Sequence, residues 1–315
     1  MKSFERLVLS HLKSITASHL DSLQFAYRAN RSVDDAVNQA LHFVMEHLDC
    51  PGTYGRILFM DLSSAFNKIL PALLEYKLRQ LDVPDSLCRW ITDFLTSRSQ
   101  CVRLGTTVSD TRTLIIGSPQ GCVLSPWLFS MYTNCCTSSH ESMKLIKFAD
   151  DTTIIRLISD GDESAYRREV ERLMSWCSYN NLELNAQKTV EMFIDFRRVT
   201  VSLSPLMLAG LPIPIVDSFC FLGTTITEDL KWEPTIRSLI RKAQQRMFIL
   251  RQRRKLQLPT KLLVEFYTAI IQSILTYSIT VWGLSTFLLP GLKPSLSRAE
   301  KAFAECGRVC AELLR

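Results

Sequence analysis

Lys147-Phe148-Ala149-Asp150-Asp151-Thr152-Thr153 is the stretch that decides the fold. Its two adjacent carboxylates are flanked by short apolar runs, with Leu145-Ile146 before them and Ile154-Ile155 after them. This pattern predicts two strands joined by a tight hairpin turn that carries the Asp pair. Because Asp is also a common turn residue, the pair by itself indicates ordinary turn chemistry at least as readily as a functional site.

A second apolar run also ends on a carboxylate. Arg56-Ile57-Leu58-Phe59-Met60-Asp61 reads as a buried strand, and sequence typical of a helix follows from Ser63. If the strands are neighbours, Asp61 meets the Asp pair at one end of a sheet. Adjacent carboxylates repel, which raises the pKa of at least one of them unless a cation is present. Hard oxygen ligands without nearby His or Cys suit Mg²⁺, and three carboxylates suit two such ions in a phosphoryl displacement.

Between these strands lies the loop Gly117-Ser118-Pro119-Gln120-Gly121-Cys122-Val123-Leu124-Ser125-Pro126. With this loop, the chain resembles the reverse transcriptases of non-LTR (LINE-type) retrotransposons, closest to the Jockey-like vertebrate branch. The resemblance runs from about Phe4 to the 270s. In chain order the matching pieces are Phe25-Ala26-Tyr27-Arg28, Asp61-Leu62-Ser63-Ser64-Ala65-Phe66-Asn67, Gly117 to Pro126, Phe148-Ala149-Asp150-Asp151, Asn185-Ala186-Gln187-Lys188-Thr189 and Phe221-Leu222-Gly223.

The resemblance implies an α+β fold of the right-hand polymerase type. Its palm would be an antiparallel sheet with helices on one face, accompanied by partial fingers and a helical thumb. The predicted divisions are partial fingers at 1–50, a palm at 51–228 with fingers elements inserted around 85–116, and a basic helical thumb with a C-terminal segment at 229–315. The chain is expected to begin inside the fingers and to lack the endonuclease, as an element copy truncated at its 5′ end would.

The resemblance also implies roles for individual residues. Two Mg²⁺ ions, or Mn²⁺, would be held by Asp61 and Asp150 with Asp151 assisting, and the Leu62 backbone carbonyl would touch the ion on the triphosphate side. Lys188 would point at the triphosphate and protonate the leaving pyrophosphate. The predicted nucleotide-binding residues are Arg28, Phe66, Gln120 and Gly121, and the predicted primer grip is Phe221, Leu222 and Gly223.

Several of these residues have a structural alternative that the sequence leaves open. Phe66 could be plain core, and Arg28 could form an ion pair with Asp34 or Asp35. Gln120 could brace its own loop, and Lys188 could be a solvated loop residue.

Charge is concentrated in one segment. The 315 residues are 47% hydrophobic and 22% charged, as in a folded protein, and carry a net charge of +6. Residues 231–261 contain ten Lys or Arg and one acid, which leaves a net charge of −3 on the rest of the chain. This basic segment predicts a thumb that grips duplex phosphates, although a solvated helix face is the alternative. The residues proposed for this contact are Arg246, Arg251, Arg253, Arg254 and Lys255.

The remaining composition concerns compartment and membrane. The ten cysteines are scattered without the usual zinc spacings, and no signal peptide is recognisable, so we expect an intracellular protein of the nucleus or cytoplasm. Residues 269–289 are uncharged and long enough to span a bilayer. Polar residues interrupt this stretch, and apolar residues recur at helical spacing, so we expect a buried helix and no membrane span.

Other helices and hairpins are predicted from the spacing of apolar residues and from the Gly and Pro residues that interrupt it. Helices are predicted at 1–20, 32–48, 85–96, 122–134, 162–180 and 296–315, and the helix following Asp61 is predicted to run from Ser63 through Leu78. The first helix should bury the face formed by Phe4, Leu7, Val8, His11, Leu12 and Ile15. Hairpins are predicted for 100–108 with 111–116, for 205–215 and for 219–226.

Two functions remain open from sequence. The first is an RNA-directed DNA polymerase that adds deoxynucleotides to a primer 3′-OH and uses an RNA template, a DNA primer and deoxynucleoside triphosphates. The second is a truncated, catalytically silent remnant that only binds nucleic acid. The sequence leaves open which protein partners, if any, the chain has.

Overall fold

The computed structural model describes residues 2–159, 161–197, 204–208 and 210–282, together with Ala304 and Arg308. By its contacts the chain forms two compact units, Met1–Ala36 with His42–Ile215 and Val37–Leu41 with Val216–Arg315. The three-part division into fingers, palm and thumb stays a prediction. The helix expected at 296–315 lies outside the described residues except for Ala304 and Arg308.

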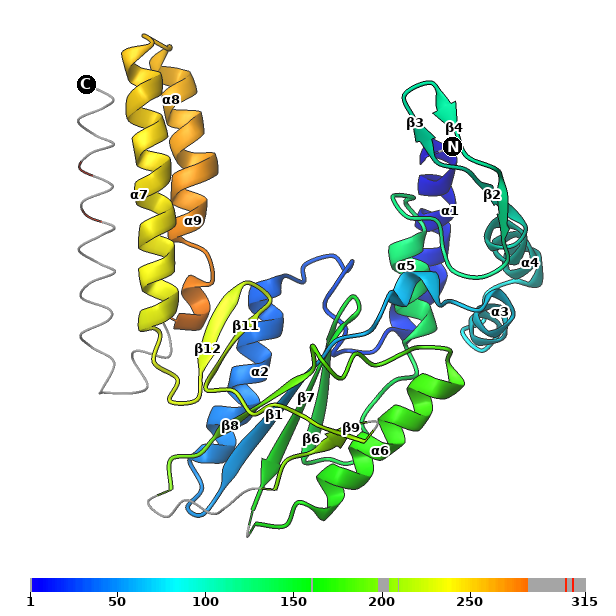
Figure 1. Ribbon diagram of the computed structural model, residues 1–315, viewed down its shortest axis with the longest axis horizontal. Coiled ribbons are helices and arrows are strands. Elements are labelled where there is room, and N and C mark those ends of the chain that lie inside the picture. Colours follow the sequence, from blue (N-terminus) through cyan, green and yellow to red (C-terminus); the bar gives the residue numbers. More distant parts are fainter. Residues whose placement is uncertain are drawn as a thin grey trace. The chain divides into compact units, whose positions relative to one another are not determined.

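A four-stranded antiparallel sheet in the order β6-β7-β1-β8 forms the centre of the first unit (Figure 1). Every residue of β1 is buried, as expected for a continuous apolar run covered on both faces. The sheet confirms the predicted α+β class. The strands are β1 (Tyr54–Met60), β6 (Met143–Phe148), β7 (Asp151–Ile158) and β8 (Val190–Ile194).

Two helices contact this sheet. α6 (Ser164–Tyr179) and the small hairpin of β9 (Met207–Leu208) and β10 (Leu211–Pro212) share an apolar cluster with one face. α2 (Val33–Leu48) contacts the other face, where a Cβ on Gly55 would lie 3.3 Å from Val44. The predicted cap of α2 is confirmed, because Ser32 and Asp35 form a reciprocal capping box. Thus α6 matches the expected helical layer, and α2 adds a contact on the opposite face.

A second apolar cluster joins the remaining helices of this unit. Its helices are α1 (Lys2–Thr16), α3 (Pro71–Arg79), α4 (Asp85–Leu95) and α5 (Ser125–Tyr132), and the 3₁₀ turn η1 (Ala17–His19) directly follows α1. The predicted buried face of α1 was partly wrong, since Phe4, Leu7 and His11 are exposed. Glu5 is buried instead, because its carboxylate accepts the Val123 backbone N–H at 2.6 Å near the start of α5.

The helix predicted from Ser63 is interrupted. A single 3₁₀ turn, η2 (Ala65–Asn67), carries Phe66, and α3 begins only at Pro71. Pro71 has no N–H to donate and restricts the preceding residue to extended backbone, which Leu70 adopts with φ −89° and ψ 114°. Phe66 therefore lies on a tight turn close to the sheet edge instead of inside a long helix.

The hairpin predicted for 100–108 with 111–116 pairs differently. β2 (Arg98–Gln100) pairs with β5 (Arg112–Leu114), and an inner hairpin joins β3 (Arg103–Leu104) to β4 (Thr107–Val108). The inner turn is possible because Gly105 has φ +62°. The sequence prediction missed this turn and placed the whole of 100–108 in one strand.

The second unit contains the other predicted hairpin and the basic helix. β11 (Ser218–Phe221) pairs with β12 (Thr224–Thr227), which confirms a hairpin at 219–226. α7 (Glu233–Lys255) packs its apolar stripe against the helical stretch of α8 (Thr260–Phe266), the π-helical η3 (Tyr267–Gln272) and α9 (Ser273–Leu275).

The helical stretch after α7 is strongly apolar. By length and composition, Thr260–Trp282 is the one helix within the described residues that is able to cross a membrane, and only 22% of its most apolar window is buried. Leu263, Ile271 and Leu275 pack with α7, whereas Leu262 and Val264 are exposed. The expected buried helix is thus buried on one face, and the absence of a membrane span stays a prediction. Residues 283–289 of the predicted stretch lie outside the described residues.

Candidate active site

Antiparallel pairing brings the three carboxylates to one edge of the sheet. Met60 pairs with Thr152, so Asp61 leaves β1 where β7 begins at Asp151. Phe148 pairs with Asp151 across the two-residue turn Ala149-Asp150, and Ala149 has φ +60°. The hairpin turn predicted for the Asp pair and its meeting with Asp61 are both present in the structure.

The carboxylates at this edge affect one another's ionisation. Burial raises the pKa of Asp151 above its ordinary value, and the negative charges of Asp150 and Asp61 raise it further. Three carboxylates in this arrangement favour either a proton or a cation, because each ionised group disfavours ionisation of the next.

The turn at residues 185–189 holds Asp61 from the other side. The Asn185 N–H donates to the Asp61 carbonyl at 2.9 Å, and the Thr189 side chain lies 3.4 Å from the Asp61 backbone nitrogen. Leu62 forms a bridge with Leu184 just beyond. The turn also carries Lys188, whose Nζ lies 3.9 Å from Asp61 Oδ2 and whose side chain is mostly exposed. Such an exposed pair is weak, so the ammonium is free to reach an anionic ligand.

The residues at the edge fit a magnesium site that is completed by substrate. Within the described residues, no three His, Cys, Asp or Glu side chains form a ready-made metal cluster. Mg²⁺ commonly takes one or two carboxylates and fills its shell with waters and substrate phosphates. Oxygen-only donors and the raised pKa of Asp151 suit that chemistry, whereas a protein-only cage would need more ligands.

The turn that carries Phe66 contacts the loop that carries Gln120 through one backbone bond and one side-chain contact. The Phe66 carbonyl accepts the Ser118 N–H at 2.9 Å, and the Gln120 amide lies 3.4 Å from the Asn67 side-chain oxygen. Phe66 is half-buried, with its ring 4.6 Å from that of Phe129. One side of the Phe66 ring therefore packs in the core, and its predicted contact with the nucleotide sugar stays a prediction. Gln120 is exposed and also braces its loop.

The two glycines of the loop play different parts. A Cβ on Gly117 would lie 2.9 Å from the backbone of Asn67, so only glycine allows the loop to approach the Phe66 turn this closely. Gly121, the predicted nucleotide-binding glycine, has φ +74° and open space around its Cα. Gly117 thus permits a close approach within the protein, and the predicted nucleotide contact of Gly121 stays a prediction.

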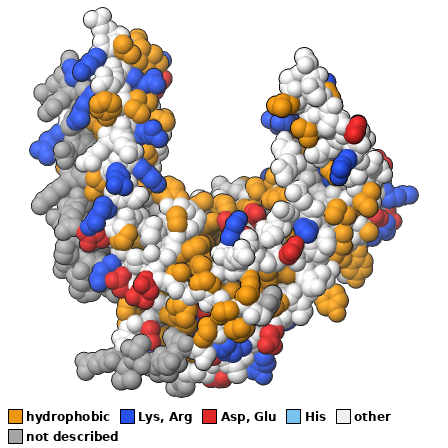
Figure 2. All heavy atoms as spheres, viewed as in Figure 1, with side chains coloured by type: hydrophobic (Ala, Val, Ile, Leu, Met, Phe, Trp, Pro, Cys, Tyr) orange, Lys and Arg blue, Asp and Glu red, His pale blue; other side chains and the backbone are white. Residues whose placement is uncertain are grey.

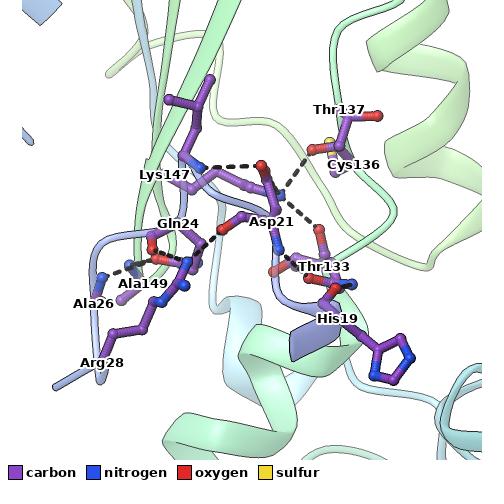
Figure 3. Close-up of polar contacts among 12 residues, drawn as sticks. His19, Asp21, Gln24, Ala26, Arg28, Thr133, Cys136, Thr137, Lys147 and Ala149 are labelled. Carbon is purple, nitrogen blue, oxygen red and sulfur yellow. Dashed lines mark hydrogen bonds and ion pairs between the residues drawn. The ribbon is translucent and has the colours of Figure 1, made fainter. Parts of the chain in front are cut away.

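A polar network contacts the Asp turn through Gln24 and Lys147 (Figure 3). Gln24 Oε1 accepts the Ala26 N–H at 3.0 Å and lies 3.4 Å from the Ala149 backbone nitrogen, in the turn itself. Lys147 is buried and donates to the carbonyls of Thr133 and Cys136, and its Nζ lies 2.9 Å from Asp21 Oδ2. These residues were not predicted from the sequence. The one signal there was a Lys inside a run predicted to be buried.

Arg28 joins this network instead of forming the ion pair that was the alternative. Its guanidinium donates to the backbone carbonyls of Asp21 at 2.7 Å and Gln24 at 3.3 Å, and Asp35 is engaged in the helix cap. Arg28 thus shapes the loop, and its predicted contact with nucleotide stays a prediction.

Tyr27 lies near the Asp turn, although it was not among the site residues predicted from the sequence. It has φ +61°, an uncommon backbone conformation for a non-glycine residue, and its neighbours Ala26 and Arg28 are both anchored to Gln24. The side chain is 41% exposed, and burial followed by the charge of Asp150 raises the pKa of its phenol. The loop therefore holds Tyr27 beside the Asp turn. Its place directly before Arg28 was the only signal in the sequence.

A cavity of about 1230 Å³ adjoins the Gly117–Gln120 loop. Trp90 and Phe94 stack within it at 5.5 Å, and Phe4 meets Trp90 edge-on at 5.6 Å. Asn67 and Gln120 also line it, so the cavity continues from the candidate site.

The second unit carries the remaining predicted residues. Phe221, Leu222 and Gly223 form the end of β11 and the turn of its hairpin. Lys and Arg side chains recur along α7, as Figure 2 shows, and Arg246, Arg251 and Lys255 are exposed. Arg253 differs, because its guanidinium lies 5.1 Å from the centre of the Phe266 ring and so contributes to packing.

An antiparallel sheet with three carboxylates at one edge, beside a glycine-bearing loop, is the palm of a right-hand polymerase. The family model described as "Reverse transcriptase (RNA-dependent DNA polymerase)" matches residues 1–226, and the chain belongs to this family. A second model, described as "Alkylated DNA repair protein alkB homolog 8, N-terminal", matches residues 232–273 only.

Curated relatives agree with this assignment. The chain is 25% identical to the probable RNA-directed DNA polymerase from transposon BS of Drosophila melanogaster over 90% of its length and 33% of that protein. It is also 25% identical to the RNA-directed DNA polymerase from mobile element jockey of the same organism, over 90% of its length and 32% of that protein. The chain thus spans about a third of these relatives, and its likeness to reverse transcriptases of LINE-type elements is confirmed.

Among solved structures, telomerase from Candida albicans, in complex with a fragment of telomeric RNA, matches 99% of this chain and 56% of its own. The TM-score is 0.51 and the identity 12%, so this likeness concerns the fold alone.

Proposed function

We propose that this chain is the polymerase part of a LINE-type reverse transcriptase and copies RNA into DNA. The observation that carries the proposal is the meeting of Asp61 with Asp150 and Asp151 at one sheet edge, beside Phe66 and Gln120. The primer 3′-OH would attack the α-phosphate of a deoxynucleoside triphosphate, and pyrophosphate would leave. We further propose an intracellular location, in the nucleus or the cytoplasm.

The residues at this edge have separate proposed roles. Asp61 and Asp150 would hold two Mg²⁺ or Mn²⁺ ions, with help from Asp151 and from the Leu62 carbonyl. When bound, such ions stabilise the charge that develops on the phosphate oxygens. Lys188, exposed and near Asp61, would approach the triphosphate and donate a proton to the leaving pyrophosphate. Arg28, Gln120 and Gly121 would position the nucleotide.

The cavity beside the loop suits the unpaired template. Its stacked Trp90 and Phe94 offer a ring surface on which bases pack, and the Asn67 and Gln120 amides offer hydrogen bonds. The carboxylate edge would then hold the newly forming base pair, while the cavity would bind the template bases that are not yet paired.

The first experiment is primer extension on poly(rA)/oligo(dT) with Mg²⁺. Template-dependent extension would establish the polymerase. If the protein binds the duplex but does not extend it with Mg²⁺ or Mn²⁺, the alternative of a catalytically silent nucleic-acid-binding remnant is correct.

Replacement of Phe66 should change the choice of sugar. Its ring has no group that rewards a 2′-OH, and burying an unpaired hydroxyl costs roughly 1–3 kcal/mol, or about ten- to a hundredfold in discrimination. Phe66→Val should therefore admit ribonucleotides while it retains much of the deoxynucleotide activity. The measurement is the ratio of kcat/KM for dGTP and GTP in both proteins. Equal losses with the two substrates would show that Phe66 acts only through its packing on Phe129.

Exposed basic residues of α7 should bind phosphates of the duplex. Replacing Arg246, Arg251 and Lys255 together with Gln should weaken duplex binding and reduce the slope of log affinity against log salt by roughly 0.9 for each phosphate that is no longer neutralised. Lys231→Gln is the matched control, because Lys231 already pairs with Asp229 at 2.7 Å. An unchanged slope in the triple variant would mean that these residues form a solvated helix face and do not bind phosphates.

A further inference from the structure

The turn of the β11–β12 hairpin has an unusual backbone. Phe221 pairs with Thr224, and the two residues between them, Leu222 and Gly223, have φ values of +47° and +89°. Positive φ at both positions is typical of a two-residue hairpin turn of type I′, but Leu222 is a costly residue there. Because an isolated two-stranded hairpin is only marginally stable in water, other contacts must hold this turn.

Tyr277 supplies such a contact. Its hydroxyl donates to the Leu222 carbonyl at 2.6 Å. A Cβ added to Gly223 would lie 2.5 Å from the same hydroxyl oxygen and 3.3 Å from Cζ of the ring. Glycine is therefore needed at 223 for two reasons, its positive φ and the space that the Tyr277 ring end occupies.

The next residue makes a second tie to the same hairpin. Ser278 Oγ and Thr224 Oγ1 are 2.7 Å apart, and both residues are fully buried. Ser278 has φ +52°, so the chain bends where these two hydroxyl-bearing side chains face the hairpin. The Trp282 indole donates to the Tyr277 carbonyl at 3.0 Å, which adds a hydrogen bond across the bend. Buried hydroxyl pairs of this kind favour one arrangement, because separating them would leave unsatisfied groups.

We propose that Tyr277 is a positioning residue that sets the hairpin turn and, through it, the 3′ end of the primer. This inference rests on the proposed function, in which Phe221, Leu222 and Gly223 contact the primer strand. Tyr277 itself touches the hairpin backbone and not the reacting atoms. Its removal should therefore affect how the primer end is held and leave the carboxylates at the sheet edge unchanged.

The test is Tyr277→Phe in steady-state and single-turnover primer extension. We expect KM for the primer–template to rise roughly three- to tenfold, as one net hydrogen bond predicts, with kcat at saturating primer–template within about twofold of wild type. The matched control is Ser273→Ala, which removes a 2.6 Å hydroxyl bond to the Ala269 carbonyl within the same helical stretch. Both variants should keep a melting temperature near that of wild type.

A second variant distinguishes positioning from simple packing. Gly223→Ala should impair primer use, because its Cβ meets the Tyr277 hydroxyl. In the double variant Gly223→Ala/Tyr277→Phe, that closest approach is relieved, so the combined loss in kcat/KM should be smaller than the product of the two single losses. Multiplicative losses, or a Tyr277→Phe variant with wild-type KM in an active enzyme, would overturn the inference alone. An inactive wild-type protein would instead overturn the proposed function.

Discussion

Asp150→Asn should lower primer extension by about three orders of magnitude or more and leave the fold intact. An amide cannot replace a carboxylate in the charge balance of a two-ion site, which contributes several kcal/mol, and each 1.36 kcal/mol corresponds to a tenfold change in rate. Asp150 lies in the turn between β6 and β7, so the substitution removes no ladder hydrogen bond of the sheet. The measurement is single-turnover extension at saturating deoxynucleotide.

Asp82→Asn is the matched control for this experiment. Asp82 is exposed and has φ +57°, a conformation that Asn also tolerates, so the control removes the same charge without backbone strain. Its activity should equal that of wild type. A readout independent of turnover is the rise in melting temperature on adding Mg²⁺, which should shrink in Asp150→Asn. Near-normal extension by Asp150→Asn would mean that the pair at 150–151 is turn chemistry and not the catalytic centre.

The carboxylates could be predicted from the sequence because each lies at the end of a recognisable strand. Asp61 directly follows the apolar run of β1, Asp150 lies in a hairpin turn, and Asp151 begins the strand after that turn. Antiparallel neighbours bring such strand ends together, so only the pairing of β1 with β7 had to be right. The roles assigned to the individual residues came from the family resemblance and stay predictions.

The contacts that support the edge were beyond sequence reasoning. Gln24 reaches the Ala149 turn across 125 positions, and Lys147 finds its carboxylate partner at Asp21. No local sequence pattern predicts these long-range contacts, because the loop that carries Gln24 has neither helical nor strand periodicity. Similarly, the break before Pro71 followed from proline chemistry, yet the periodic apolar residues around it suggested one continuous helix.

A buried ion pair anchors the strand that delivers Asp61. Arg56, in the middle of β1, donates to both carboxylate oxygens of Glu191 in β8, at 2.8 and 2.6 Å, and both side chains are fully buried. The Tyr166 hydroxyl of α6 also donates to Glu191, at 2.5 Å. Glu163 approaches Arg56 at 2.5 Å from the rim of the same site. The pair thus ties the central strand to its neighbour and to the covering helix.

Glu191→Gln should destabilise the protein by about 3 kcal/mol, at the lower end of the 3–5 kcal/mol typical for breaking a buried pair, because Glu163 still partly neutralises Arg56. The measurement is the shift of the urea unfolding midpoint at constant slope. Glu183→Gln is the control, since it breaks the exposed pair with Lys68 and should cost no more than about 0.5 kcal/mol. The KM for deoxynucleotide in the folded Glu191→Gln fraction should stay near wild type, because Glu191 pairs with Leu58, three residues before Asp61. A cost as small as that of the control would show that Glu163 alone can neutralise Arg56, whereas a changed KM would show that strain in β1 reaches Asp61.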